Sequence, residues 1–195
     1  MQRKAHVDRK TTETDIKLSL TVDGTGTYSV DTPVGFLNHM LELFAKHGIF
    51  DLSLKATGDV EIDYHHTVED IAICLGQAVN KALGDRMNIK RYGDFTVPMD
   101  EARARVTMDI SGRPYLVCKF PELSGKVGEF DLELVEEFFQ AFVSNSGTTL
   151  HITVESGRNT HHIIEAIFKA FGRALDAATA LDARGTGIPS TKGTL

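Results

Sequence analysis

Two kinds of hydrophobic spacing divide the chain into strands and helices. Apolar and polar residues alternate strictly in segments that we expect to be half-exposed strands, namely residues 14–22, 50–57, 102–110 and 149–155. Shorter strands are predicted at 27–31 and 115–120. Apolar residues recur at helical spacing in four longer segments, from Pro33 to about Lys46 and over about 66–83, 131–143 and 161–180.

Glycines and turn residues mark where several of these segments end. Gly48 and Gly84 follow two of the helical segments and are expected as helix C-terminal caps. Asp23 to Gly26 predicts a hairpin that joins the first two strands, and Ser111-Gly112 predicts the turn that returns the chain in its second half.

The order strand, strand, helix, strand, helix occurs twice, and an internal duplication is its simplest explanation. We therefore predict an α+β fold of one domain, residues 1–195, made of two β-β-α-β-α halves at about 10–90 and 91–185 and a tail at 186–195. The halves are expected to pack their sheets against helices around a pseudo-twofold axis.

Composition narrows the class of protein. The chain has 195 residues, 42% apolar and 25% charged, which is typical of a soluble globular protein with a substantial core. Its net charge of −6 argues against nucleic-acid binding. No apolar run is long enough to span a membrane, and the N-terminal residues have no apolar core for a signal peptide. With only Cys74 and Cys118, both in apolar segments, we expect a cytoplasmic protein with reduced thiols.

One motif, H-H-x-x-E, occurs in both halves. It comprises His65, His66 and Glu69 in the first half and His161, His162 and Glu165 in the second, 96 residues further on. Each copy opens a helical segment, where the Glu would lie roughly 40° and 60° around the axis from the two His residues. Imidazole and carboxylate together suit a divalent transition metal. Four of the eight histidines lie in this repeated motif, which favours a site with two metals over two helix starts that carry histidine by chance. Packing of the halves around a pseudo-twofold axis would bring the two copies of the motif together.

Three other histidines have suggestive positions. His39 lies in the middle of the first helical segment and His151 is a polar outlier on the last strand, so these are the best additional ligands, one from each half. His47 lies in the last turn of its helix, where an interaction with the helix C-terminus is the simpler interpretation.

Basic residues lie near the ends of segments. Arg91 follows the first long helix, Arg113 lies in a turn, and Lys169 lies eight residues beyond His161. The tail G-I-P-S-T-K-G-T-L places Ser190, Thr191 and Lys192 between glycines, a composition that suits a phosphate group. A solvated, mobile tail is the alternative.

Together these motifs closely resemble the imidazoleglycerol-phosphate dehydratase family, the dimanganese enzymes of histidine biosynthesis, in its monofunctional form. The resemblance covers essentially the whole chain and rests on R-K-T-T-E-T, F-L-N-H-M-L, A-K-H-G-x-F-D-L, H-H-T-V-E-D, P-M-D-E-A, S-G-R-P-Y-L, T-L-H-I, H-H-I-I-E-A-x-F-K-A and P-S-T-K-G. It implies four-stranded sheets packed on helices, like domain 2 of a ribosomal small-subunit protein. It also implies an octahedral homo-oligomer of twenty-four chains with active sites between chains.

The resemblance further implies the ligands of two Mn²⁺ ions per chain, without assigning ligands to either ion. By position they are His39, His65, His66, Glu69, His151, His161, His162 and Glu165. The substrate would contact several of these and the basic residues, namely Glu13, His39, His47, His65, Glu69, Arg91, Arg113, His161, Lys169, Ser190, Thr191 and Lys192.

The implied reaction dehydrates imidazole glycerol phosphate to imidazole acetol phosphate. The substrate has no carbonyl that would acidify the C–H bond, but an imidazole that loses its N–H becomes electron-rich and can expel the adjacent hydroxyl. A base outside the ligand set must then remove a proton from carbon. Glu13 matches the acidic position of the family and is the expected base, although an ordinary exposed Glu at a strand edge is the simpler interpretation.

Two other functions remain compatible with two metals. A dinuclear phosphoesterase would need a basic pocket as well, but such sites usually use several Asp ligands. A non-catalytic metal-storage or scaffold oligomer is the third possibility, and the phosphate-type tail argues against it.

Overall fold

The computed structural model describes residues 2–120 and 123–195. The first half comprises β1 (Lys4–Lys10), β2 (Thr14–Thr21), β3 (Tyr28–Asp31), α1 (Gly35–Gly48), β4 (Asp51–Gly58) and α2 (His65–Leu83). The second half repeats this order with one small hairpin inserted: β5 (Tyr92–Met99), β6 (Ala102–Asp109), β7 (Tyr115–Lys119), β8 (Lys126–Val127), β9 (Phe130–Asp131), α3 (Leu134–Ser146), β10 (Thr149–Ser156) and α4 (Thr160–Thr179). The predicted α+β fold with duplicated halves is confirmed.

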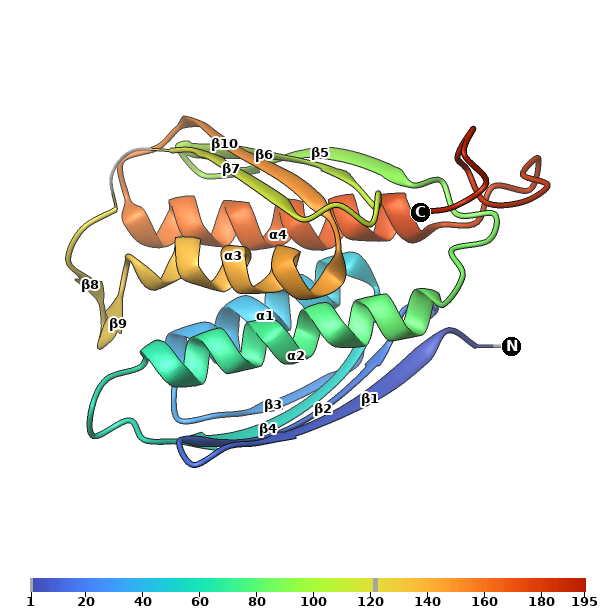
Figure 1. Cartoon of the computed structure of the whole chain (residues 1–195). Helices are drawn as coiled ribbons and strands as arrows, with labels where there is room; N and C mark the ends of the chain where they lie inside the picture. Colours follow the sequence, from blue (N-terminus) through green and yellow to red (C-terminus); the bar gives the residue numbers. More distant parts are fainter. Residues whose placement is uncertain (1, 121–122) are drawn as a thin grey trace.

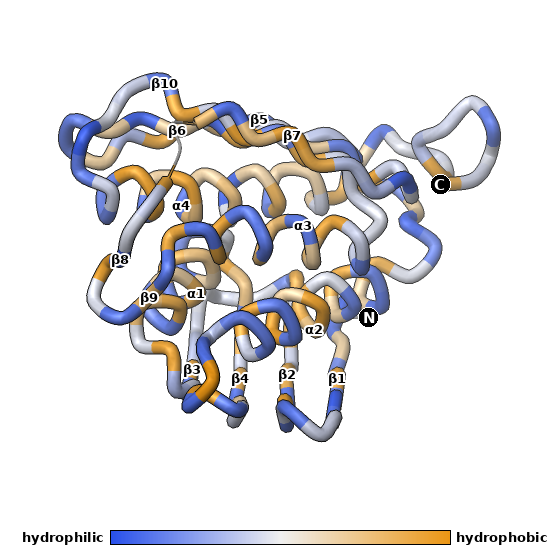
Figure 2. The backbone as a smooth tube through the Cα atoms, turned by 60° about the vertical axis from the view of Figure 1, so that its left-hand side comes forward, coloured by the Kyte–Doolittle hydropathy of each residue, from blue (hydrophilic) through white to orange (hydrophobic). Residues whose placement is uncertain are grey.

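The helices lie between two four-stranded sheets (Figure 1). The strand orders are β1-β2-β4-β3 and β5-β6-β10-β7, so the halves have the same topology. On β2, for example, Ile16, Leu18 and Leu20 are buried while Lys17 is exposed, because alternate side chains face the helices. Hydrophobic and hydrophilic residues alternate at short intervals along the chain (Figure 2), as expected when every element buries one face.

The predicted hairpin at Asp23 to Gly26 is wrong. β2 pairs antiparallel with β1 and β4, whereas β3 pairs in parallel with β4. The same holds in the second half, where β7 pairs in parallel with β10 and not with β6. The turn residues therefore lead into a loop that crosses to the far side of β4 or β10.

Other differences concern the ends of elements. β1 and β5 were not predicted, and each pairs with the strand that follows it through a tight turn. α3 begins three residues later than expected, because Phe130 and Asp131 first pair with β8. Gly48 is the last residue of α1, and Ile49 adopts the left-handed conformation that follows it.

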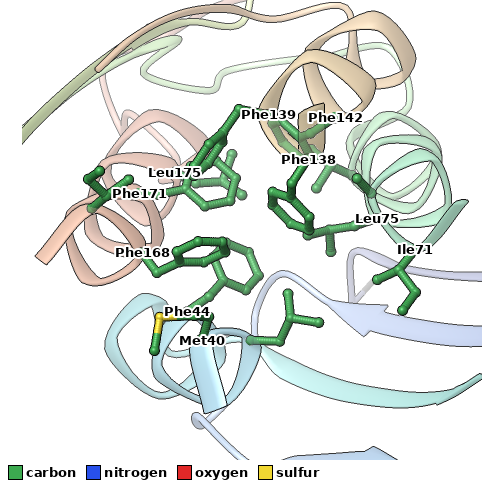
Figure 3. Packing of buried hydrophobic residues seen from close by; sticks show 14 of the residues in the cluster. Met40, Phe44, Ile71, Leu75, Phe138, Phe139, Phe142, Phe168, Phe171 and Leu175 are labelled. Carbon is green, nitrogen blue, oxygen red and sulfur yellow. The ribbon is translucent and has the colours of Figure 1, made fainter. Parts of the chain in front are cut away.

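Aromatic side chains fill the space between the helices (Figure 3). Phe171 of α4 stacks on Phe44 of α1 with ring centroids 4.9 Å apart, and it meets Phe142 of α3 edge-on at 4.9 Å. α1 and α4 pack closely because Gly172 has no side chain, since a Cβ there would lie 2.6 Å from the carbonyl oxygen of Phe44. Gly172 therefore allows the backbones of α1 and α4 to approach each other closely.

Candidate functional site

Side chains outside α4 fix its first turn. Asn159 caps the helix, because its side-chain oxygen accepts hydrogen bonds from the backbone N–H groups of His161 at 3.0 Å and His162 at 3.4 Å. Glu101, in the turn between β5 and β6, accepts hydrogen bonds from the backbone N–H groups of Asn159 at 2.8 Å and Arg158 at 3.2 Å. The start of α4 is therefore anchored to the neighbouring sheet.

α1 brings His39 to the same place. Nε2 of His161 lies 3.2 Å and Nε2 of His39 lies 3.6 Å from Oε2 of Glu165. Within residues 2–120 and 123–195, these three form the group of potential metal ligands whose ligand atoms all lie within 4.8 Å of one another. The His39 side chain is 44% exposed and that of Glu165 only 9%, so the imidazoles reach solvent above a buried carboxylate. We call these three residues the α4 cluster.

His162 points away from its neighbour. The rings of His161 and His162 are nearly perpendicular, at 86°, with centroids 6.2 Å apart. Nδ1 of His162 lies 2.8 Å from Oε2 of Glu101. This contact, together with the backbone N–H donors, lowers the pKa of Glu101 to about 2, and the carboxylate in turn raises the pKa of His162. The arrangement fixes the ring orientation and leaves Nε2 as the nitrogen available to a metal.

Positive charge surrounds the buried side of the α4 cluster. Nζ of Lys169, one turn beyond Glu165, lies 2.6 Å from Oε1 of that carboxylate. Burial raises the pKa of Glu165, but the hydrogen bond and charge of Lys169 outweigh it, and the pKa is lowered. Burial, with the charges of Lys169 and Arg173, lowers the pKa of His47, whose carbonyl accepts a hydrogen bond from Arg173 at 3.4 Å. His47 is therefore a neutral neighbour of the cluster at neutral pH.

The first motif, at the start of α2, is held in a similar way. Nδ1 of His66 lies 3.0 Å from Oδ2 of Asp59, which raises the pKa of the imidazole. A side chain at Gly58 would clash with the hydroxyl of Thr67, so the glycine lets the end of β4 approach α2 and deliver Asp59. His65 is exposed, and its ring is at 85° to that of His66.

Glu13 lies beside this first motif, at the tip of the β1–β2 turn. Its Oε2 is 3.9 Å from Nδ1 of His66, and its side chain is half exposed. Glu69 lies in the same first turn of α2 and is partly buried. We call His65, His66 and Glu69 the α2 cluster. The structure thus places the expected base next to expected ligands.

The two clusters do not meet within one chain. α2 packs on α3 and on β1 and β2, whereas α4 packs on α1 and on β5 and β6. Phe168 and Phe171 of α4 lie across the aromatic core from Leu75 and Ile71 of α2 (Figure 3). Directly packed helices are already about 8–10 Å apart, and these two are separated by other side chains. The expectation that the pseudo-twofold axis brings the clusters together within a chain is therefore wrong.

The tail and two arginines form an anion pocket. The lining includes five of the six basic or hydroxyl residues expected to contact the substrate, namely Arg91, Arg113, Ser190, Thr191 and Lys192, but not Lys169. Arg91 holds the tail by donating to the carbonyl of Pro189 at 2.9 Å. Asp109 accepts two hydrogen bonds from Arg91, at 2.6 and 3.0 Å, and lies 3.6 Å from Arg113. One carboxylate therefore faces two guanidinium groups, so positive charge remains for an anion.

The anion pocket and the α4 cluster lie at opposite ends of α4. The backbone N–H of Arg91 donates to the carbonyl of Ala178, in the last turn of the helix, while His161 lies in the first turn. The rise of an α-helix makes this separation about 25 Å. In Figure 1 the tail lies at the end of the molecule opposite to the starts of α2 and α4.

His151 is separated from all the other expected ligands by the second sheet. It is exposed on β10 between Leu150 and Ile152, which are fully buried against the helices. Because alternate side chains of a strand face opposite sides, His151 lies on the outer face of the sheet. It therefore cannot join the α4 cluster of its own chain.

Three residues that orient expected site residues were missed from the sequence. Asp59 and Glu101 orient the second His of each motif, and Asp109 aligns Arg91. Asp59 and Glu101 lie at the ends of strands next to the motifs, and the E in P-M-D-E-A could have been recognised as an acid at a turn. Asp109 gives no such signal, because it ends an ordinary alternating strand.

The fold and the site together define an α+β enzyme that combines histidine–carboxylate clusters with an anion pocket. The family model described as imidazoleglycerol-phosphate dehydratase matches residues 32–175. The chain is 60% identical over its whole length to the imidazoleglycerol-phosphate dehydratase of Geobacter sulfurreducens, and covers all of that protein. It belongs to the imidazoleglycerol-phosphate dehydratase family, whose members are hydro-lyases of histidine biosynthesis.

Solved structures of the same family have this fold. The Staphylococcus aureus dehydratase superposes with a TM-score of 0.83 at 45% identity, covering 92% of this chain and 99% of that one. The Pyrococcus furiosus enzyme gives 0.84 at 36% identity, covering 97% of this chain and 100% of that one. The resemblance noted from the motifs is confirmed, and the phosphoesterase and storage alternatives are set aside. In the described part of the chain, no helix is long and apolar enough to cross a membrane.

Proposed function

We propose that this chain dehydrates imidazole glycerol phosphate at a two-manganese site that is assembled between chains of a homo-oligomer. The observation that carries the proposal is the separation of about 25 Å along α4 between the α4 cluster and the anion pocket. A phosphorylated three-carbon imidazole is far too short to reach both. A site that binds both ends of this substrate must therefore combine the clusters of one chain with the pocket of another.

The donor sets of the two clusters fit manganese. The α4 cluster offers two imidazole nitrogens and one carboxylate within 4.8 Å of one another, and the α2 cluster contains the same residue types. Mixed imidazole and carboxylate ligands are compatible with Mn²⁺ as well as with Zn²⁺ and Fe²⁺. His162 and His151 would complete the ligand set, with His151 reaching a neighbouring chain from the outer face of its sheet. Bound Mn²⁺ would supply Lewis-acid charge that favours the deprotonated form of the substrate imidazole.

Other residues of the chain bind the phosphate, contact the substrate and remove the proton. The anion pocket binds the phosphate through guanidinium, ammonium and hydroxyl groups. Lys169 and His47 line the α4 cluster and contact the middle of the substrate. Glu13 removes the proton from carbon, because its exposed carboxylate stands beside the α2 cluster without being one of its ligands.

An assembly of twenty-four chains with octahedral symmetry would bring these parts together. Each chain would give its α2 cluster, its α4 cluster and its tail to different sites. Because the oligomer is closed, every cluster would find a partner. Metal binding and association would then stabilise each other.

Replacing Glu13 with Gln tests the base. The change keeps size and hydrogen-bonding capacity but removes the ability to accept a proton. We expect a fall in kcat of about 10²–10⁴-fold, the usual scale for loss of a positioned base. The manganese content, two ions per chain by metal analysis, should not change, and neither should the particle size.

Two results would count against this assignment. A fall of only a few-fold would mean that another group takes the proton, and loss of manganese together with activity would make Glu13 part of the metal site. Measuring the ketone product distinguishes dehydration from release of inorganic phosphate.

A further inference from the structure

A partly buried charged network lies beneath the turn that carries Glu13. Oδ1 of Asp70, in α2, lies 2.8 Å from a guanidinium nitrogen of Arg9, and the hydroxyl of Thr14 donates to Oδ2 of the same carboxylate at 2.5 Å. Thr14 is 4% exposed and Asp70 5%, whereas the side chain of Arg9 is 34% exposed and reaches the carboxylate from the edge of the network. We call Arg9, Thr14 and Asp70 the buried triad, after its buried hydroxyl and carboxylate. It joins β1 and β2 to α2, one residue beyond Glu69.

The second half of the chain has no such network at the matching place. Thr14 and Ala102 are the first residues of β2 and β6, and both are buried. Asp70 and Ala166 each follow the Glu of their H-H-x-x-E motif. Arg9 and Val97 also match, because they pair with Ile16 and Ala104, each two residues after the first residue of its strand. The three matching residues of the second half are therefore all apolar: Val97, Ala102 and Ala166. The same arrangement of strands and helix therefore forms in the second half without charges at this place.

The difference between the halves coincides with a difference between two glutamates. Glu13 and Glu101 hold matching positions, each directly before the strand that follows the turn. Glu101 is engaged by His162 and by two backbone N–H groups, which hold it as an ionised acceptor. The carboxylate of Glu13 is half exposed, and its contact with His66 is 3.9 Å long. Of these two glutamates, Glu13 therefore has the less engaged carboxylate.

The backbone around Glu13 is nevertheless fixed. Its N–H donates to the hydroxyl of Thr11 at 3.1 Å, and its carbonyl accepts from the N–H of Asp59 at 3.1 Å. The N–H of Thr14 also donates to the Thr11 hydroxyl, at 3.0 Å, and the hydroxyl of Thr14 donates to the carboxylate of Asp70. The turn is thereby tied both to the end of β4 and to the helix that carries the α2 cluster.

We propose that Asp70, through Thr14 and Arg9, is a positioning residue for Glu13. The inference rests on the proposed role of Glu13 as the base. A carboxylate at a turn tip must be held within reach of one carbon atom, and a small displacement lowers the rate of proton transfer. Because Asp70 directly follows Glu69, the buried triad makes the base and the α2 cluster parts of one rigid unit.

Replacing the Thr14 hydroxyl tests this role. Thr14→Val keeps the shape but removes the donor, and Thr14→Ser keeps the donor. We expect Thr14→Val and Asp70→Asn to lower kcat about tenfold with KM changed less than about twofold, and Thr14→Ser to restore most of the activity. Thr179→Val is the control, because it removes another buried hydroxyl, one that donates to the backbone carbonyl of Asp176 in the last turn of α4. Its kcat should stay at the wild-type value.

The decisive measurement repeats Thr14→Val in the Glu13→Gln background. If the hydroxyl acts through Glu13, its loss should change the residual kcat by less than about twofold once the base is absent. Manganese content and particle size are measured for every variant. If Thr14→Val does not assemble, Thr14→Ala takes its place, since alanine occupies the matching position 102.

Three results would overturn the positioning role. The first is an equal loss of kcat on Thr14→Val in the wild-type and the Glu13→Gln backgrounds. The second is a kcat of Thr14→Val within about twofold of the wild type. The third is a loss of manganese from Thr14→Val that accounts for its lost activity. A Glu13→Gln variant that keeps full turnover would overturn it too, but through failure of the base assignment. An inactive Glu13→Gln with an active Thr14→Val would refute the positioning role alone.

Discussion

At the scale of residues, each H-H-x-x-E motif turns its two imidazoles in different directions. The ring centroids are 6.2 Å apart in both copies, at 85° and 86°. The second His of each pair is held by an acid, Asp59 or Glu101, that lies outside the motif. The motif itself can be recognised in the sequence, and Glu101 gives a weaker signal as an acid at a turn, but the role of both acids depends on which strand ends lie beside the helix.

Lys192 is predicted to bind the phosphate, which does not change during the reaction. Lys192→Ala should therefore raise KM about 10- to 100-fold, the effect of losing a charged hydrogen bond, with a smaller effect on kcat. Lys126→Ala is the control, because it removes an exposed lysine that pairs with Asp131 away from the anion pocket. Steady-state kinetics that do not differ between the two variants would exclude the tail as the phosphate-binding segment.

At the scale of elements, hydrophobic spacing predicts the helices and most of the strands but not the partners of the strands. Alternation shows which face of a strand is buried, and this face is the same whether the neighbour is parallel or antiparallel. β3 and β7 therefore appeared to be returning strands of hairpins. β1 was missed because K-A-H-V-D-R-K has only two apolar residues, and its pairing with β2 depends on backbone hydrogen bonds.

The start of α4 depends on its cap, and this can be tested. Asn159→Ala removes the acceptor for two backbone N–H groups and should lower the free energy of unfolding by about 1 kcal/mol. Because the cap fixes the backbone of both histidines, the affinity for manganese should fall as well. Asn159→Asp keeps the acceptor and should restore both properties. Manganese titration together with denaturant unfolding measures the two effects, and an Asn159→Ala variant with wild-type affinity would contradict the link.

At the scale of the whole molecule, the chain separates the parts that the reaction needs together. The α2 cluster, the α4 cluster and His151 lie on different faces of the helices and the second sheet, and the anion pocket lies at the far end of α4. The H-H-x-x-E motifs and the tail could be recognised because each is local in sequence, whereas His39, Arg91 and Arg113 join them from other elements. The separation of these parts could not be predicted, because hydrophobic patterns do not specify how far apart the ends of packed helices lie.

The shared site can be tested by mixing two inactive variants. His66→Ala disables the α2 cluster and His162→Ala disables the second motif, so particles of either variant alone should be inactive. The two chains are coexpressed with different affinity tags, and mixed particles are purified through both tags. If each site combines motifs from different chains, random mixing leaves about a quarter of the sites with both motifs intact.

The turnover of imidazole glycerol phosphate by these mixed particles is the most direct measurement. The account predicts about a quarter of the wild-type turnover averaged over all sites, with manganese retained in the restored sites. Mixed particles that turn over no more substrate than either variant alone would show that both motifs act within one chain, and would contradict the account.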